Sequence, residues 1–200
     1  MSLKLFDTIG SDPEFIVFNK TTRKPVSMVG KIPGSKEEPS PIAVEGCCTL
    51  PDNVLVEFTV PPAYELQTLY GYIEQCRYCI TKQLGDEYEL RAKSSQNFPS
   101  SELQTIDAQT FGCLPSNSLY SGNGWSIIPL PEEVGNLRSA GFHLHFGWND
   151  VPTEDERKDF VFLCDLFLGI PSFFTDKDNR RRKIYGKNLV NTYIFYIFTV

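Results

Sequence analysis

Two segments of this chain show the strict alternation of apolar and polar side chains that is typical of a β-strand with one buried face. In residues 53–60 the apolar positions are Val54, Val56, Phe58 and Val60. In residues 139–148 they are Phe142, Leu144, Phe146 and Trp148. A strand with one apolar face must pair with other strands and bury that face, so the chain must build a sheet that is covered on one side.

The periodicity changes directly after the first of these strands. Pro61 and Pro62 predict the end of that strand, because proline cannot donate a ladder hydrogen bond. From residue 63 to residue 84 apolar side chains recur at steps of three and four, which predicts an amphipathic helix. They are Leu66, Leu69, Ile73, Cys76, Ile80 and Leu84.

A second helix is predicted further along the chain. Thr153 and Glu156 have the spacing of a capping box, in which the two residues satisfy each other's backbone N–H groups. The apolar pattern continues to Gly169, and the Ile-Pro step at residues 170–171 is expected to end the helix. Strands combined with two long helices predict an α+β fold with a largely antiparallel sheet, in which helices pack on the face of Phe142.

The remaining segments are shorter and less regular. Apolar runs at residues 15–18 and 25–29 flank a turn-like segment and predict a strand pair. Residues 30–41 carry two lysines, are too rich in proline and glycine for regular structure, and are suited to a flap over a site. Residues 94–133 are expected to form loops around short strands.

Charge and cysteine usage restrict the class of protein. The chain of 200 residues has a formal net charge of −6, which provides no broad positive field for a nucleic-acid backbone. No signal peptide opens it, so a cytoplasmic protein with reduced thiols is expected. Cys76 and Cys79 could form a redox motif or half of a zinc site. Structural thiols are favoured, because Cys76 falls on the apolar helix stripe and no second pair has zinc-finger spacing.

The only two histidines of the chain, His143 and His145, lie two residues apart in an alternating strand. Both imidazoles therefore point to the same side, and the flanking glycines allow a ligand to approach the backbone. Two imidazoles buried without a charged partner would be costly, so a functional pair is favoured over a satisfied pair on the sheet face. Contact with a metal ion and contact with phosphate both remain open.

Three carboxylates lie in or beside predicted strands. Asp12 and Glu14 are two residues apart at the mouth of an apolar strand and can face one way, although an exposed strand end would also explain them. Glu57 lies among Val, Phe and Thr and must face solvent, a cation or a site to avoid the cost of desolvation. Several carboxylate oxygens suit Mg²⁺ or Mn²⁺ better than zinc.

Positive charge is concentrated near the end of the chain. The residues are Arg180, Arg181, Arg182, Lys183 and Lys187. Guanidinium and ammonium groups can bind phosphate, although a solvated run of charges is an equally ordinary explanation. A basic segment in an acidic protein therefore indicates a local phosphate site only together with the other motifs.

Five segments, taken in order, resemble one known family. Residues 10–18 resemble the glutamine-synthetase segment in which two acids bracket a proline ahead of an apolar strand. Residues 139–147 resemble the His-x-His strand of the same superfamily, which also includes glutamate–cysteine ligase. More narrowly, residues 52–63, 111–115 and 181–187 resemble the phage COOH-NH2 ligases known as phiEco32-like, type 2. The ordered series is far more specific than any single motif.

The resemblance implies a glutamine-synthetase-like catalytic domain over residues 1–187 and a reaction that needs ATP and Mg²⁺, with Mn²⁺ as an alternative ion. Such a ligase joins a carboxylate to an amine through an acyl phosphate. The metal ligands that the resemblance implies are Asp12, Glu14, Glu57 and His143. It also implies that His145, Arg181 and Lys187 contact ATP and that Arg181, Arg182 and Lys187 act in catalysis.

The same likeness implies that polar segments follow residue 187. Residues 188–200 instead form an apolar, aromatic tail, so we expect an incomplete site, weak turnover and low solubility. The substrates implied are small-molecule or peptide carboxylates and amines in a host cytoplasm, with no nucleic-acid or membrane partner. A metal-dependent hydrolase and a catalytically inactive binding or scaffold relative are the alternative functions.

Overall fold

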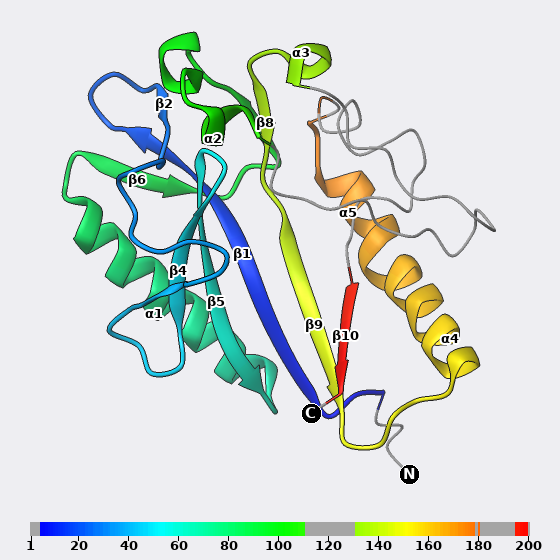
Figure 1. Ribbon diagram of the computed structural model, residues 1–200. Coiled ribbons are helices and arrows are strands. Elements are labelled where there is room, and N and C mark those ends of the chain that lie inside the picture. Colours follow the sequence, from blue (N-terminus) through cyan, green and yellow to red (C-terminus); the bar gives the residue numbers. More distant parts are fainter. Residues whose placement is uncertain (1–4, 111–130, 179, 181–194, 200) are drawn as a thin grey trace.

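The computed structural model describes residues 5–110, 131–178, 180 and 195–199, which form a sheet with long helices beside it (Figure 1). The sheet strands are β1 (Thr8–Asn19), β2 (Pro25–Val26), β3 (Ser40–Pro41), β4 (Cys48–Asp52), β5 (Leu55–Ala63), β6 (Tyr88–Arg91), β9 (Phe142–Trp148) and β10 (Phe195–Thr199). Their order across the sheet is β10, β9, β1, β5, β4 and β3, while β2 and β6 both pair with β1. β1 is therefore the central strand of the described sheet.

The described strand pairs of this sheet are antiparallel except at one edge, where β10 runs parallel to β9. This confirms the predicted α+β class with a largely antiparallel sheet. The predicted strand pair near the N-terminus is also confirmed, since Val17 of β1 lies opposite Val26 of β2. The parallel strand comes from within the apolar tail at residues 188–200, so part of that tail joins the sheet.

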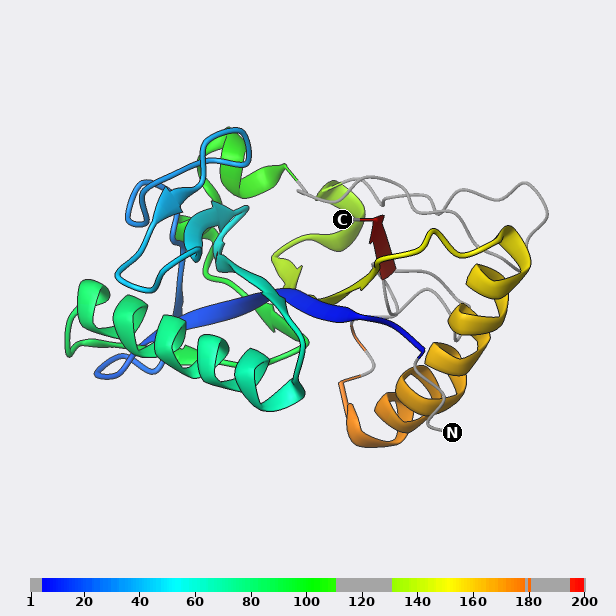
Figure 2. The same cartoon turned by 90° about the horizontal axis from the view of Figure 1, so that it is seen from below.

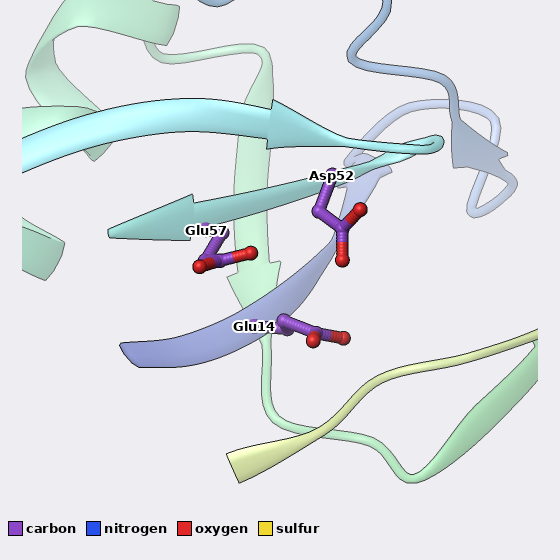
Figure 3. Close-up of side chains that lie close together, drawn as sticks. All are labelled: Glu14, Asp52 and Glu57. Atoms are coloured by element: carbon purple, nitrogen blue, oxygen red, sulfur yellow. The ribbon is translucent and has the colours of Figure 1, made fainter. Parts of the chain in front are cut away.

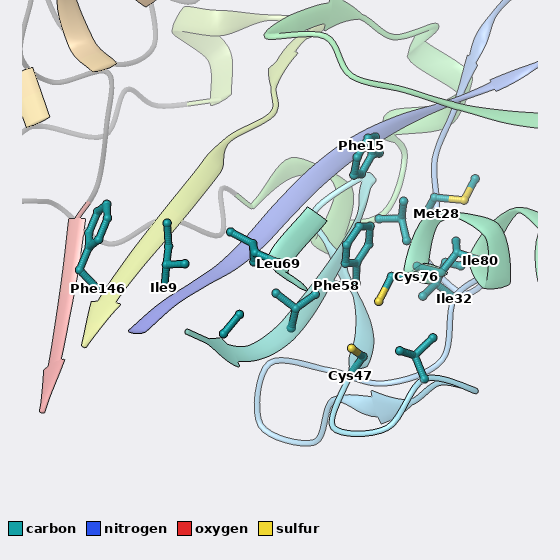
Figure 4. Packing of buried hydrophobic residues seen from close by; sticks show 14 of the residues in the cluster. Ile9, Phe15, Met28, Ile32, Cys47, Phe58, Leu69, Cys76, Ile80 and Phe146 are labelled. Carbon is teal, nitrogen blue, oxygen red and sulfur yellow. The ribbon is translucent and has the colours of Figure 1, made fainter. Parts of the chain in front are cut away.

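The long helices cover one face of the sheet, as Figure 2 shows for α1 (Leu66–Leu84) and α4 (Glu154–Cys164). Their apolar sides share one core with the strands (Figure 4). The α1 side of that core includes Phe15, Phe58, Leu69, Cys76 and Ile80. On the α4 side, the rings of Phe146 and Phe160 meet edge to face with centroids 4.8 Å apart. Helices therefore pack on the Phe142 face of β9, as predicted.

The boundary between β5 and α1 differs from the prediction. β5 continues through Pro61 and Pro62 to Ala63, and α1 begins only at Leu66. Ser11 pairs with Val60 and Ile9 pairs with Ala63, so β5 contains one extra residue in this stretch. The two prolines lie in this bulge, where a missing N–H costs less than it does in a regular ladder.

The second long helix begins as predicted but does not end there. Thr153 and Glu156 form the complete capping box that opens α4. Past Cys164 the chain continues through the π-helical turn η2 (Asp165–Gly169) into α5 (Ile170–Thr175). Pro171 does not stop the helix, and it lies at the start of α5 directly after the π-helical turn.

Shorter elements cover part of the opposite face of the sheet. They are β7 (Ser95–Asn97), η1 (Ser100–Leu103), α2 (Ile106–Gln109), α3 (Pro131–Val134) and β8 (Leu137–Ser139). They lie in or next to the region predicted to be loops around short strands, of which residues 111–130 lie outside the described residues. Ile16 and Phe18 of β1 belong to the second apolar core, which also includes Phe98 and Leu103. Asp12 and Glu14 continue the same face of β1 beyond that core.

Cys76 lies where the helical pattern predicts it. Cys76 is fully buried in the core beside α1, as its place on the apolar stripe predicted, and Cys47 belongs to the same cluster (Figure 4). Within the described ranges, no helix combines the length and apolar character that crossing a membrane would require.

Candidate metal centre

Three buried carboxylates from three strands gather on the sheet face opposite the long helices (Figure 3). The register places Glu14 of β1 directly opposite Glu57 of β5, and Asp52 joins them from the end of β4. One oxygen of each side chain lies within 4.8 Å of an oxygen of each of the other two. Glu14 is only 7% exposed, Asp52 6% and Glu57 9%, so water does little to screen their charges. This group, which we call the carboxylate cluster, fits a hard divalent cation.

Asp52 reaches the carboxylate cluster because the chain reverses tightly between β4 and β5. Asn53 adopts a left-handed backbone conformation with φ of 56°, which asparagine tolerates better than most residues. Leu50 then lies opposite Glu57, and Asp52 lies opposite Leu55. Because alternate residues of a strand share a face, Asp52 and Glu57 point to the same side of the sheet.

Crowding of the carboxyl groups changes their affinity for protons. The pKa of Glu57 is raised from 4.5 to about 9, first by burial and then by the negative charges of Asp52 and Glu14. In the absence of a cation, Glu57 therefore keeps its proton at neutral pH. A divalent ion would reverse this balance, because its charge favours the ionised carboxylate. Carboxyl groups with pKa values displaced in this way are candidates for functional sites.

A lysine also contacts the carboxylate cluster. Lys36 Nζ lies 3.0 Å from Asp52 Oδ1, and the positive charge of Lys36 opposes the rise in the pKa of Glu57. Lys36 belongs to residues 30–41, the segment that the sequence predicted to be a flap over a site. The structure therefore brings this segment to the cluster.

Gly141, just before β9, allows a close approach between an acid and an imidazole. Its N–H donates a hydrogen bond of 2.7 Å to Glu14 Oε2. A Cβ atom at this position would lie 3.2 Å from Glu14 Oε1 and 3.3 Å from His143 Nε2, which is tighter than most Cβ contacts. Glu14 and His143 thus face the same small space, and a side chain at residue 141 would intrude on it.

Asp12 connects the two histidines. It lies opposite His143 in the β1–β9 register, and its carboxylate oxygens are 2.9 Å from His143 Nδ1 and 3.3 Å from His145 Nε2. Burial acts to raise the pKa of Asp12, but the hydrogen bonds and charges of the two imidazoles outweigh it, and the pKa is lowered. Ionised Asp12 can therefore hold the Nδ1–H of His143 and turn Nε2 toward Glu14.

The predicted site residues on the strands share one face of the sheet but form two groups. Glu14 and Glu57 belong to the carboxylate cluster, whereas Asp12 lies with His143 and His145. The hydrogen bond from the Gly141 N–H to Glu14 connects the carboxylate cluster to the chain just before β9, the strand that carries both histidines. A metal role for any of these side chains stays a prediction.

Asp52 was not predicted from the sequence, although a signal for it exists. The Asp-Asn step just before the alternating strand is typical of a hairpin turn, and counting back from that turn places Asp52 on the side of Glu57. The predicted basic residues Arg181, Arg182 and Lys187 lie outside the described residues. Arg180 is described, and its guanidinium pairs with Asp178 at 2.6 Å.

A cleft of about 660 Å³ opens beside Glu14. It is lined on one side by Glu14, Gly141 and Phe142, and on the other by the end of α5 and the residues that follow it. Its charged lining also includes Lys93, Asp176, Lys177 and Asp178. A ligand in this cleft would therefore meet both signs of charge next to the carboxylate cluster.

The fold and the site together define an α+β protein that carries a buried carboxylate cluster and an Asp–His pair on one sheet face. No family model matches the chain, and neither a curated protein nor a solved structure is similar enough to count as a match. The chemistry of the site is therefore the main basis for a functional proposal.

Proposed function

We propose that this protein is an ATP- and Mg²⁺-dependent ligase that joins a carboxylate to an amine. The observation that supports this most is the carboxylate cluster, in which oxygens of Glu14, Asp52 and Glu57 lie within 4.8 Å of one another. Burying three acids together does not stabilise a fold, so the arrangement calls for a functional reason. The ordered resemblance of five segments to phage COOH-NH2 ligases of the glutamine-synthetase-like superfamily supports the same reaction.

Glu14 and Glu57 are the proposed metal ligands, and Asp52 joins them. Because all three offer carboxylate oxygens, the cluster favours Mg²⁺ or Mn²⁺ over zinc. Bound Mg²⁺ would supply positive charge to neutralise the phosphates of ATP. Glu57 must lose its proton to act as a ligand, so binding of the ion is coupled to pH.

The two histidines are proposed to extend the site along β9. Asp12 holds Nδ1 of His143, which leaves Nε2 directed toward Glu14 and able to act as a ligand. A carboxylate behind a metal-binding imidazole is a common arrangement, and it gives Asp12 an orienting role in addition to its implied role as a ligand. His145, held by the same carboxylate, is proposed to lie near the phosphates of ATP.

In the proposed reaction, an oxygen of the substrate carboxylate attacks the γ-phosphorus of ATP and ADP leaves. The amine nitrogen then attacks the acyl carbon of the acyl phosphate, inorganic phosphate leaves, and the nitrogen loses a proton. No protein nucleophile is needed, so positioning and charge stabilisation carry the catalysis. Arg181, Arg182 and Lys187 are assigned to the transferred phosphate on the resemblance alone, and the cleft beside Glu14 is the proposed entrance for the substrates.

The test is a reaction screen with ATP, Mg²⁺ and panels of amino acids, short peptides and amines, read by product mass and phosphate release. Phosphate release that requires both an acid and an amine, with a matching amide product, is the expected result. Glu57→Gln is the control, and it should abolish both signals. Hydrolysis with zinc and without ATP would instead support a metal-dependent hydrolase. Mn²⁺ binding without turnover on any panel would support a non-catalytic relative.

A further inference from the structure

Lys36 forms an ion pair with one of the three buried carboxylates of the cluster. Its Nζ lies 3.0 Å from Asp52 Oδ1. The Asp52 side chain is 8% exposed, whereas the Lys36 side chain is 46% exposed. The aspartate is therefore fixed in the interior, and the lysine reaches it from the surface with room to move away.

The segment that carries Lys36 is anchored on both sides of it. Ile32 is 4% exposed and belongs to the main core. Gly34 has a φ of +94°, and a Cβ there would come within 2.7 Å of both Ser40 N and Thr49 O, so glycine is required at this close approach. Ser40 in turn pairs with Thr49 across β3 and β4. The backbone of this segment thus presents the lysine at a defined place, and its long side chain provides the freedom of movement.

Charge makes the lysine and a bound divalent ion competitors. An ion held by Glu14, Asp52 and Glu57 would occupy the space between oxygens that lie within 4.8 Å of one another. The ammonium group would then lie a few ångströms from a like charge in a poorly solvated place, which is unfavourable. The half-exposed side chain can relieve this repulsion by swinging into water.

We propose that Lys36 is an internal counter-cation of the carboxylate cluster, which binds Asp52 when the metal is absent and must be displaced when a divalent ion enters. This inference rests on the proposed metal site. It adds a residue that sets the affinity for the ion, through competition for one carboxylate. Lys36 thereby weakens metal binding and stabilises the metal-free protein.

The test is calorimetric titration of the full chain with Mn²⁺, in wild type, Lys36→Met and Lys31→Met. Removal of the competing ion pair should tighten Mn²⁺ binding about tenfold in Lys36→Met, because the ion no longer has to displace the ammonium group from Asp52. Lys31→Met is the matched control, because it removes the same charge from the same segment at an exposed position outside the ion pair of Lys36 with Asp52. It should leave the affinity within about twofold of wild type, since exposed charges are screened.

A second readout is thermal unfolding in EDTA and in Mn²⁺. Lys36→Met should unfold at a lower temperature than wild type in EDTA, and Mn²⁺ should restore it. If Lys36→Met precipitates, Lys36→Gln provides the same test with a polar side chain. Equal or weaker Mn²⁺ binding by the Lys36 variants would overturn the competition while leaving the metal site intact. Absence of Mn²⁺ binding in wild type and variants alike would overturn the metal site itself.

Discussion

At the scale of single residues, Glu57 links the geometry of the site to its chemistry. Its carboxyl group is buried next to two other acids, and its pKa is raised to about 9. A proton is therefore the cation that Glu57 holds in the metal-free protein at pH 7. Replacing that proton by Mn²⁺ or Mg²⁺ makes metal binding a proton-releasing reaction.

We predict that Mn²⁺ binding at pH 7 releases about one proton per ion in the wild type. In Glu57→Gln the release should disappear and binding should be strongly weakened, because the amide keeps the shape of the side chain but cannot ionise. Titration calorimetry in buffers with different ionisation enthalpies measures the proton count. Mn²⁺ binding to wild type without proton release would contradict protonation of Glu57 at pH 7.

Arg138 is a second buried charged residue, with a structural role. It is 2% exposed, and its guanidinium donates hydrogen bonds to the carbonyl groups of Ala108, Gly135 and Leu137. Burial lowers its pKa. Arg138 therefore ties α2 to β8 on the face of the sheet that carries the carboxylate cluster.

We predict that Arg138→Met lowers the free energy of unfolding by about 2 to 4 kcal/mol, because it leaves buried carbonyl groups without donors. Urea denaturation followed by circular dichroism measures the change. Arg23→Met, at an exposed position, is the control and should change stability by less than about 0.5 kcal/mol. A decrease in the free energy of unfolding no larger in Arg138→Met than in the control would show that Arg138 does not stabilise the contact between α2 and β8.

At the scale of elements, the start of α4 shows how strongly local sequence can act. Thr153 Oγ1 accepts a hydrogen bond from the N–H of Glu156, and the Glu156 carboxylate accepts one from the N–H of Thr153. This box needs only four consecutive residues, so it forms wherever the helix is placed. The end of the same helix depends on context, since the chain continues through η2 into α5.

We predict that Thr153→Ala destabilises the protein by about 1 kcal/mol, the usual worth of an N-cap. Glu156→Ala should have a smaller effect, because it removes only the return hydrogen bond. The two changes should be less than additive in the double variant, since both break the same box. Urea unfolding of the four proteins tests this, and strictly additive losses would argue against the reciprocal pair.

At the scale of the whole molecule, the electrostatics of the site influence folding stability. Glu57 binds its proton more tightly in the folded state, so its contribution to stability is complete below about pH 4.5 and is lost as pH rises toward 9. The pKa of Asp12 is lowered instead of raised. Its contribution to folding stability is therefore present above pH 3.8 and is lost as pH falls below that value. Between these limits the raised pKa of Glu57 makes the metal-free protein less stable as pH rises.

We predict that the metal-free protein becomes less stable between pH 5 and pH 9, and that Glu57→Gln flattens this dependence. Each unit of pKa difference corresponds to about 1.4 kcal/mol, so the change should be readily measurable. Thermal unfolding in EDTA across this range provides the data, and saturating Mn²⁺ should reverse the loss at the alkaline end. Equal slopes for wild type and Glu57→Gln would exclude Glu57 as their cause.

Much of the fold could be predicted because the relevant signals are local. Alternation with period two placed His143 and His145 on one side of β9, and steps of three and four defined the buried side of α1. The errors occurred where a neighbouring strand or turn overrode a local rule. Pro61 and Pro62 predict the end of the strand, but the bulge between β1 and β5 accommodates both prolines.

The sequence by itself determined which side chains share a face within each strand, because that follows from the pleat of a single strand. Only the tertiary structure decided which strands became neighbours and in what register. That choice placed Glu14 opposite Glu57, added Asp52 across the turn at Asn53, and joined Asp12 to both imidazoles. It also brought Lys36 to Asp52. Apart from the hairpin that carries Asp52, no local pattern encodes these pairings, because they arise from packing between separate segments of the chain.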